Sequence, residues 1–490
     1  MLFNSFNFLF YLPIVFVLYW HVFQRNLRWQ NLFVVVASYV FYGWWDWRFL
    51  LLIVFTSLCS YGSGLLIDHC FQRDEQITAK WWAGLNIVVN LLVLGVFKYF
   101  NFFADSFHMV MAGIGLKIDA PTLHVILPVG ISFYTFQALS YTIDVYRRQL
   151  PVTRDIVAFF AFVSFFPQLV AGPIERASNL LPQFQNRRSF DYAKAVDGLR
   201  QMLWGFFKKL VVADNCAIAV NSIWENYTEQ TGFMLLLGGV LFAFQIYCDF
   251  SGYSDIAIGC ARLFGINLSR NFDYPYFSRS IPEFWRRWHI SLMTWLRDYI
   301  YFPMGGSRCS RWKVVRNILV VFFISGLWHG ANWTFICWGL YHACLVSVYS
   351  ILNIKSKLTY NRDRDGLLNF AIDFGKMVMT FFLVVVGWII FRSASIHEAY
   401  HYLSAMFNIS IFDVTESIIL MEGMYLPVSI PMILIMLCAE WIQRNSNHAL
   451  EFHNVKLLRS PSLRWSVYYL LIICILQFGG SEQSFIYFQF

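Results

Sequence analysis

Long apolar stretches recur along almost the whole chain, and they are the feature that most restricts its fold. About 20 consecutive apolar residues cross the hydrocarbon core of a bilayer, and a spanning segment must satisfy its own backbone, which a helix does. The pattern therefore predicts an all-α, polytopic integral membrane protein with about 11 transmembrane helices, plus re-entrant and interfacial helices. The apolar runs span residues 6–20, 31–44, 49–66, 81–103, 124–141, 156–171, 231–250, 317–329, 333–351, 370–391, 425–441 and 466–478.

Composition supports this class and excludes others. Charged residues make up only 13% of the chain, against about 25% in soluble domains. Mean hydropathy is +0.52, and 58% of the 490 residues are hydrophobic. We expect one membrane-embedded domain over residues 1–490. The net charge of +8 lies in short loops between apolar runs, so nucleic acid is not an expected partner, whereas membrane lipid is.

The loop charges predict an orientation. Basic loops at 146–154, 175–227 and 262–316 should face the cytoplasm, and the acidic loop 393–422 should face outward. The run 6–20 has no basic residue before it and no small-residue cleavage site after it, so we expect a retained membrane helix. The run 156–171 has basic flanks on both sides and prolines at 167 and 173, which predicts a broken or re-entrant segment.

Residues 191–224 form a different pattern. Leu199, Met202, Phe206 and Leu210 recur at helical spacing, with Lys208 and Lys209 at other positions. Such a segment is typical of an amphipathic helix at the cytoplasmic interface, or of a helix packed on the bundle. The sequence favours neither alternative.

His329 is an ionisable residue inside an apolar run, in the stretch Ser325 to Trp333. Desolvation disfavours the imidazolium, so a neutral ring is expected, which can take a proton from a hydroxyl or attack an acyl group. Gly330 allows close backbone approach, and Trp328 and Trp333 can form walls of a site. A structural histidine bonded across helices is the alternative.

His289 ends a cationic, aromatic cluster at residues 284–289, and we expect it to share one buried polar site with His329. Trp285 belongs to this cluster. Arg286 and Arg287 can hold phosphates bidentately, while His289 can polarise a carbonyl. The alternative is an interfacial helix with snorkelling arginines and tryptophans at the membrane boundary.

Other polar residues lie near these histidines. Asn332 is three residues from His329 and can orient its ring or bridge helices. For His342 we favour a structural role. The spacing between His289 and His329 is too long for a local metal motif, and we predict no metal.

A polar group at residues 248–255 ends the run 231–250, and it includes Asp249 and Asp255. Buried carboxylates usually pair with cations or backbone amides, and we expect Arg262 or Arg286 as the partner. The group is predicted to support the structure, not to react.

Taken together, these segments resemble the membrane-bound O-acyltransferase family. The residues that carry the resemblance are 165–174, 247–255, 284–289, 325–333 with 338–342, and 485–490, spread over most of the chain. Within the family the chain is similar to the bacterial branch that acylates exported polymers such as alginate and teichoic acid. The resemblance implies a helical fold around a central tunnel, with His329 at its centre and His289 as a second polar position.

The resemblance further implies a function. A thioester donor, acetyl-CoA in the leading interpretation, would reach the site from the cytoplasm, with Trp285, Arg286, Arg287, Trp328 and Asn332 as donor-binding residues. No bound cofactor is expected. The acceptor would be an exported polysaccharide such as alginate, with periplasmic acetyltransferases as partners and the bacterial cytoplasmic membrane as the location.

Three alternatives stay open. D-alanyl transfer to teichoic acid would need a carrier-protein donor. A second acyltransferase interpretation has a lipid or protein as the acceptor. A polysaccharide or small-molecule transporter belongs to another class, and it is disfavoured because the sequence shows no matching halves with broken helices.

Overall fold

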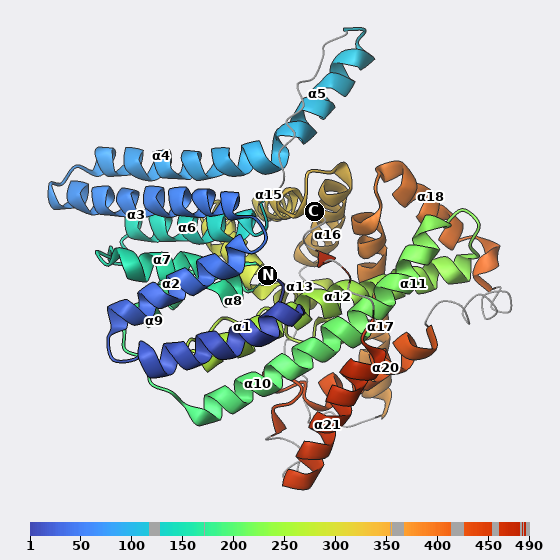
Figure 1. Cartoon of the computed structure of the whole chain (residues 1–490). Helices are drawn as coiled ribbons and strands as arrows, with labels where there is room; N and C mark the ends of the chain where they lie inside the picture. The colour runs from blue at the N-terminus through green and yellow to red at the C-terminus, as the bar shows by residue number, and fades with distance from the viewer. Residues whose placement is uncertain are drawn as a thin grey trace. The chain divides into compact units, whose positions relative to one another are not determined.

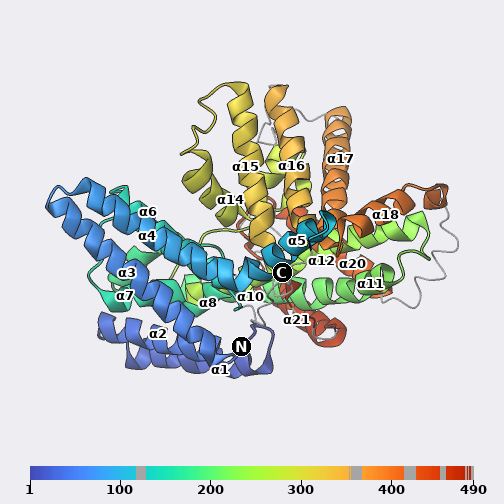
Figure 2. The same ribbon diagram turned by 90° about the horizontal axis from the view of Figure 1, so that it is seen from above.

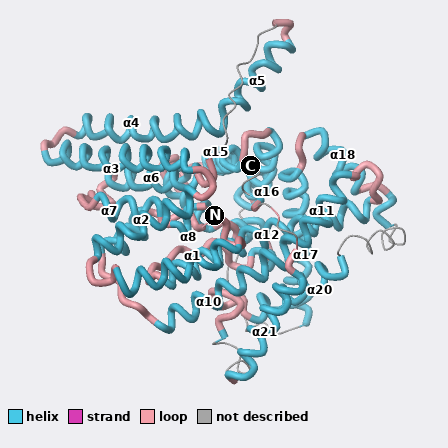
Figure 3. Tube along the Cα trace, in the orientation of Figure 1, coloured by secondary structure: helices cyan, strands magenta, loops and turns pink. Residues whose placement is uncertain are grey.

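The computed structural model describes residues 1–116, 128–170, 172–352, 354, 367–412, 426–452, 460–480, 483 and 485–486. Within these ranges every regular element is a helix, as Figure 3 shows. The all-α prediction is confirmed. The described residues form two compact units, residues 1–199 with 257–269 and residues 200–256 with 270–490, and each is described by itself. The single domain over 1–490 stays a prediction.

The first unit is built around three helices that pack side by side, α3, α4 and α6 (Figure 1). Buried polar side chains join them: Thr142 Oγ1 of α6 donates to Asn86 Oδ1 of α4 at 2.9 Å, and Asn86 Nδ2 donates to Ser60 Oγ of α3 at 3.3 Å. Polar bonds between helices of this kind hold membrane bundles together, where apolar burial does not distinguish protein from lipid. The helices of this unit are α1 (Phe6–Val17), η1 (Leu18–Val22), α2 (Leu27–Gly43), η2 (Trp47–Phe49), α3 (Leu50–Gln72), α4 (Gln76–Leu94), η3 (Gly95–Tyr99), α5 (Phe100–Gly113), α6 (Ile131–Tyr146), α7 (Ile156–Ser164), α8 (Phe166–Leu169), α9 (Ala177–Gln185) and the first part of α10 (Tyr192–Phe206).

The predicted break in run 156–171 is present. Asp155 caps the start of α7, which ends at Ser164, and Phe165 leaves the helical conformation with ψ 109° before α8 begins. The amide of Gln168 donates to the carbonyl of Phe162 at 2.9 Å, so the buried turn satisfies part of its own backbone. Ala171, the last residue of the predicted run, lies outside the described residues.

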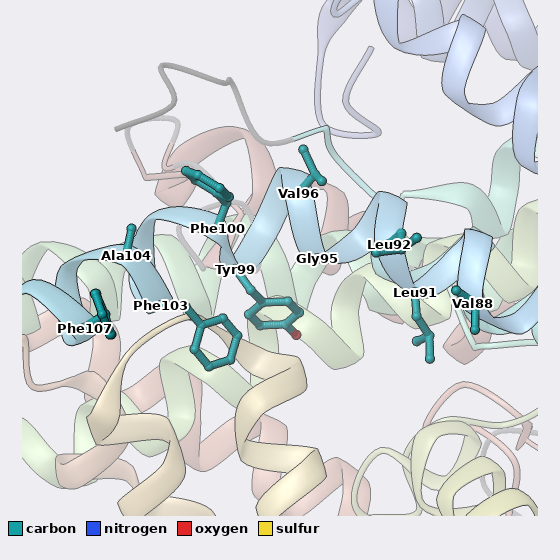
Figure 4. Close-up of a pocket in the computed structure, with 10 residues that line it drawn as sticks. All are labelled: Val88, Leu91, Leu92, Gly95, Val96, Tyr99, Phe100, Phe103, Ala104 and Phe107. Carbon is teal, nitrogen blue, oxygen red and sulfur yellow. The ribbon is translucent and has the colours of Figure 1, made fainter. Parts of the chain in front are cut away.

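The predicted run 81–103 is part of a longer continuous helical stretch, α4–η3–α5. None of the described residues of α5 is buried. Figure 4 shows an apolar groove along this stretch, lined by Val88, Leu91, Leu92, Gly95, Val96, Tyr99, Phe100, Phe103, Ala104 and Phe107. Nearly the whole lining is hydrocarbon, as expected of a surface in contact with lipid.

The second unit holds both histidines of interest. Its helices α15, α16 and α17 stand side by side in sequence order (Figure 2). A Cβ at Gly326 would collide with the carbonyl of Phe335, and one at Gly339 with that of Phe322, so two glycines let α15 and α16 meet along their backbones. The elements are η4 (Phe207–Ala213), α11 (Asp214–Glu225), α12 (Gly232–Leu263), η5 (Pro275–Phe277), α13 (Ile281–Arg287), α14 (Ile290–Leu296), η6 (Arg297–Tyr301), α15 (Arg311–His329), α16 (Trp333–Ile351), α17 (Leu367–Arg392), α18 (Ile396–Met406), η7 (Ile409–Phe412), α20 (Leu426–Ile442) and α21 (Pro461–Phe478).

Six helical stretches among the described residues are long and apolar enough to cross a membrane. Shorter apolar helices occur at Phe6–Val22 and Pro427–Ile442. The polytopic class is therefore present, while the number of about 11 crossings stays a prediction. The six stretches are Trp47–Gln72, Gln76–Gly113, Gly232–Leu263, Trp333–Ile351, Leu368–Arg392 and Pro461–Phe478.

The segment 191–224 forms the helices α10, η4 and α11, and its residues from 200 on belong to the second unit. Lys208 and Lys209 are only 3% and 1% exposed. Close approach of α10 to α12 makes this possible, because Gly205 and Gly252 face each other and a Cβ on either would contact the other's carbonyl. The packing of this part is observed, and a position of the segment at the cytoplasmic interface stays a prediction.

Candidate active site

His329 is the last residue of α15, which the glycine contact at Gly326, one turn earlier, fixes against α16. Its side chain is buried, with aromatic rings on several sides. The ring centroids of Trp328, Trp338 and Phe391 lie 5.0, 5.0 and 5.3 Å from that of His329. In its neutral form an imidazole placed here could accept a proton.

His289 connects α13 to α14 in a left-handed backbone conformation, with φ 45° and ψ 52°. The side chain is 1% exposed, and Nδ1 lies 3.0 Å from Oδ1 of Asn271. Burial lowers the pKa of His289 to about 3, so its ring is neutral at physiological pH. A residue other than glycine is uncommon in this conformation, and such backbone strain often occurs at functional sites.

The contacts of Asn271 determine which nitrogen of His289 carries the proton. The amide of Asn271 donates from Nδ2 to Ser254 Oγ at 3.2 Å. Its Oδ1 accepts from Ser291, from Oγ at 2.9 Å and from the backbone N–H at 3.4 Å. Since a backbone N–H can only donate, the atom that faces it must be the oxygen. Oδ1 therefore accepts from Nδ1–H of His289, and Nε2 carries the lone pair.

Trp328 brings the two histidines into one aromatic region. Its ring centroid lies 5.6 Å from that of His289 and 5.0 Å from that of His329. Phe250, a residue of α12, packs against His289, with 4.7 Å between the two ring centroids. The rings of His289 and His329 therefore both pack against the indole of Trp328, and a shared polar site for them stays a prediction.

The predicted donor-binding residues around α13 lie in different environments. Trp285 is buried, with its ring 4.9 Å from His342 and 5.5 Å from Trp338. Arg286 is exposed at the end of α13. Arg287 forms an ion pair with Glu283 at 3.0 Å. A phosphate could reach Arg286 more readily, because its side chain is the more exposed of the two.

Asn332 caps a helix. Its Oδ1 accepts from the backbone N–H of Thr334 at 3.1 Å, and its Nδ2 donates to the carbonyl of Ala394 at 2.9 Å. These bonds fix the start of α16 immediately after His329. Trp333, predicted as a wall, is 49% exposed, and Trp338 and Phe391 are two of the rings that contact His329.

The carboxylates of α12 pair with lysines, not with the predicted arginines. Lys208 lies 2.6 Å from Asp255, and Lys209 lies 2.7 Å from Asp249 and 2.8 Å from Asp214. Burial by itself lowers the pKa of Lys209, but Asp249 and Asp214 together raise it above its ordinary value, so the ammonium stays charged. The predicted partner Arg262 instead pairs with Asp197 in the first unit.

The same part of α12 holds a further buried carboxylate. Tyr247 lies 3.0 Å from both carboxylate oxygens of Glu440, a residue of α20 that is 2% exposed. The network of α12, η4 and α20 therefore contains the charged groups that the sequence marked as structural support. Of the residues in this part of α12, Phe250 contacts the ring of His289.

These observations define a class: a helical, multi-pass membrane protein with two buried imidazoles among aromatic rings. Such a site suits acyl transfer, since a neutral imidazole can either deprotonate a hydroxyl or accept an acyl group itself.

The comparisons place the chain in a family. Residues 41–386, more than two thirds of the chain, match the model of the membrane-bound O-acyltransferase family, so the protein belongs to that family and is an O-acyltransferase. It is 41% identical to the probable alginate O-acetylase AlgI of Pseudomonas aeruginosa over 85% of this chain and 76% of that protein. It is 32% identical to the peptidoglycan O-acetyltransferase of Helicobacter pylori over 100% of this chain and 98% of that protein. The teichoic acid D-alanyltransferase of Bacillus subtilis is 30% identical over 57% of this chain.

Sequence reasoning missed Asn271. It lies between α12 and η5, in no apolar run, and is only one of many polar loop residues. The sequence offered one signal, a short polar residue close to the cluster at 284–289. Such residues are too common for this signal to identify Asn271. Only the bond to His289 distinguishes it.

Replacing Asn271 by alanine should lower kcat by about 100-fold, the lower end of what general acid–base catalysis contributes, because Nδ1–H of His289 loses its acceptor. KM for the donor should change little. Steady-state kinetics of the purified enzyme measure both. Asn317→Ala is the matched control, since Asn317 is equally buried and bonds the carbonyls of Met304 and Gly306. Equal losses in the two variants would contradict the positioning role of Asn271.

Proposed function

We propose that the protein transfers acetyl groups from acetyl-CoA to hydroxyls of an exported polysaccharide, across the bacterial cytoplasmic membrane. The observation that carries the proposal is the pair of buried imidazoles that both contact Trp328, in a chain that is similar to O-acetylating proteins over most of its length. Alginate is the leading polymer, because the alginate O-acetylases are about 41% identical to this chain.

In the proposed reaction His329 takes the proton of the acceptor hydroxyl, and the oxygen attacks the acetyl carbonyl. The C–S bond of the thioester breaks, the ester C–O bond forms, and the proton passes from His329 to the departing thiolate, which gives CoA and the acetylated polymer. His289 would contribute by orienting the substrate through a hydrogen bond accepted at Nε2, because the tautomer set by Asn271 leaves Nε2 without the proton that polarising a carbonyl would need. A variant with two half-reactions passes through an acetyl group on the His329 ring.

The donor would approach with its phosphates near Arg286, the exposed arginine of the cluster. Trp285, Trp328 and the α16 start capped by Asn332 would shape the path toward His329. Periplasmic acetyltransferases would take the acetyl group onward where this protein does not act on polymer itself. No resident cofactor enters the reaction.

Peptidoglycan is the second candidate acceptor. The alignment with the peptidoglycan O-acetyltransferase covers 98% of that protein, whereas the alignment with the alginate O-acetylase covers 76%. The nearly complete coverage of the peptidoglycan O-acetyltransferase favours peptidoglycan as the acceptor, whereas the higher identity to the alginate O-acetylase favours alginate. The D-alanylation relative matches only 57% of this chain, which supports acetyl over D-alanyl as the transferred group.

The test uses purified protein in detergent with acetyl-CoA labelled in the acetyl group. De-O-acetylated alginate oligosaccharides and peptidoglycan fragments are offered in parallel, and an acceptor-free arm measures hydrolysis and covalent adduct. We expect label to leave CoA and to be transferred preferentially to one acceptor, and His289→Ala to lower the rate. Turnover of a carrier-protein thioester but not of acetyl-CoA would overturn the proposed donor.

A further inference from the structure

The last described residues, 478–480, 483, 485 and 486, here called the chain end, are bound into the second unit by hydrogen bonds of their backbone. After α21 the carbonyl of Phe478 accepts from Asn215 Nδ2 at 2.8 Å, and the N–H of Gly480 donates to the carbonyl of Leu210 at 3.0 Å. The carbonyl of Gln483 accepts from Lys209 Nζ at 3.2 Å. The N–H of Ile486 donates to Asp249 Oδ2 at 2.7 Å. Irregular backbone buried this deeply requires such partners.

Two of these bonds use the buried ion group. Lys209 and Asp249 pair with each other at 2.7 Å, and each also binds the chain end, Lys209 at Gln483 and Asp249 at Ile486. A buried charge is stable only where its hydrogen-bonding capacity is largely used. The charged network and the chain end therefore depend on each other, and α12 is held where they meet.

Side chains continue this contact toward the active site. Phe485 is 0% exposed, and its ring lies 4.3 Å from Tyr253 and 6.2 Å from Phe250, measured between centroids. Phe250 in turn meets the ring of His289 edge-on, at 4.7 Å and 86°. Asn271 fixes Nδ1 of that imidazole, and Phe250 limits the tilt of its plane.

We propose that Phe485 and Phe250 are positioning residues for His289: the chain end closes behind α12 and holds the imidazole in its reactive orientation. The inference rests on the role given to His289 in the proposed function. It extends that role to a part of the chain beyond residue 386, where the match to the family model ends. A displacement of about 1 Å in a reacting group can cost about 100-fold in rate, so a missing ring two contacts away is enough to matter.

The alternative is that Phe485 only fills the core. Both roles predict lower stability for Phe485→Ala, and only positioning predicts a specific effect on His289. Phe242→Ala is the matched control, because Phe242 is also a fully buried phenylalanine, lies on α12, and packs against Trp224 and Arg392. Phe485→Leu keeps most of the volume and serves as the conservative variant.

The experiment uses the full-length protein in detergent and has two readouts. The first is kcat per folded molecule at saturating acetyl-CoA. We expect Phe485→Ala to lose about 10- to 100-fold in kcat. KM should change little, Phe485→Leu should recover most of the loss, and Phe242→Ala should keep near-normal kcat despite a lower melting temperature. Equal kcat losses in Phe485→Ala and Phe242→Ala would overturn the proposal.

The second readout needs no turnover. Diethyl pyrocarbonate modifies neutral imidazoles, and peptide mass spectrometry measures the rate at His289 relative to His342, which is 0% exposed and packs against Trp285 and Trp338. We expect the ratio to rise several-fold in Phe485→Ala and to stay unchanged in Phe242→Ala. An unchanged modification ratio in Phe485→Ala would overturn the positioning contact. Full activity of His289→Ala would instead overturn the catalytic role of His289, and the modification ratio would then still test the contact by itself.

Discussion

His329→Ala should abolish acetyl transfer, with kcat reduced by at least about 1,000-fold, while the protein still inserts and purifies. Removing the ring takes away the proposed proton acceptor, and general acid–base catalysis alone contributes about 100- to 10,000-fold. The aromatic residues around His329 remain, so we expect the cage to persist around a small cavity. The measurement is transfer of labelled acetyl from acetyl-CoA, with expression and monodispersity in detergent recorded for the same preparation.

Two variants give this result its meaning. His329→Gln keeps hydrogen-bonding capacity without basicity and should be as inactive as the alanine variant. His342→Gln changes a histidine of the neighbouring helix that is equally buried and does not contact Trp328 in any described ring pair. It should retain substantially more transfer. Normal activity of His329→Ala would end the proposal that this ring performs the chemistry.

Lys209→Met should have the largest effect on stability. It leaves Asp249 and Asp214 buried without their cation, and removing one partner of a buried pair costs about 3–5 kcal/mol. It also removes the donor to the carbonyl of Gln483. We expect poor accumulation in the membrane and a melting transition far below that of the parent, measured by size-exclusion chromatography of heated, detergent-solubilised protein.

The matched control is a pair on the surface. Arg297 pairs with Asp298 at 2.8 Å, but the arginine side chain is 51% exposed, so Arg297→Met should change stability by less than about 1 kcal/mol. Combining Lys209→Met with Asp249→Asn removes one of the two stranded charges and should recover part of the loss. A stability for Lys209→Met equal to that of Arg297→Met would contradict the assigned burial of the charge.

Apolar patterning predicted much of the helical structure because lipid-facing and core-facing segments both require it. The run 333–351 coincides with α16, and the run 370–391 lies within α17. The run 231–250 was too short, since α12 continues to Leu263 through its carboxylates. The predicted run ended at Phe250, next to Asp249, because an isolated carboxylate opposes an apolar environment, and the sequence does not reveal that Lys209 neutralises it from 40 residues away.

The sequence singled out the two histidines of the candidate site, but it did not reveal the residues that hold their side chains in place. His289 and His329 stood out because histidines inside apolar or aromatic stretches are rare. The roles suggested for neighbours were local guesses: Asn332 caps α16, and Asn271 bonds His289. Pairing of this kind depends on which loops meet in space, and the residue type alone carries no such information.

The left-handed backbone at His289 has a consequence for natural and engineered variation at this position. Its φ of 45° can be adopted cheaply by glycine, and moderately well by asparagine and aspartate, but β-branched residues are strongly disfavoured. Substitutions at this position should therefore fall into two groups. Glycine and asparagine should leave the amount of folded protein unchanged and alter catalysis, whereas valine and isoleucine should lower the amount of folded protein itself. A survey of all substitutions at this one codon would thus separate the demands of folding from those of chemistry.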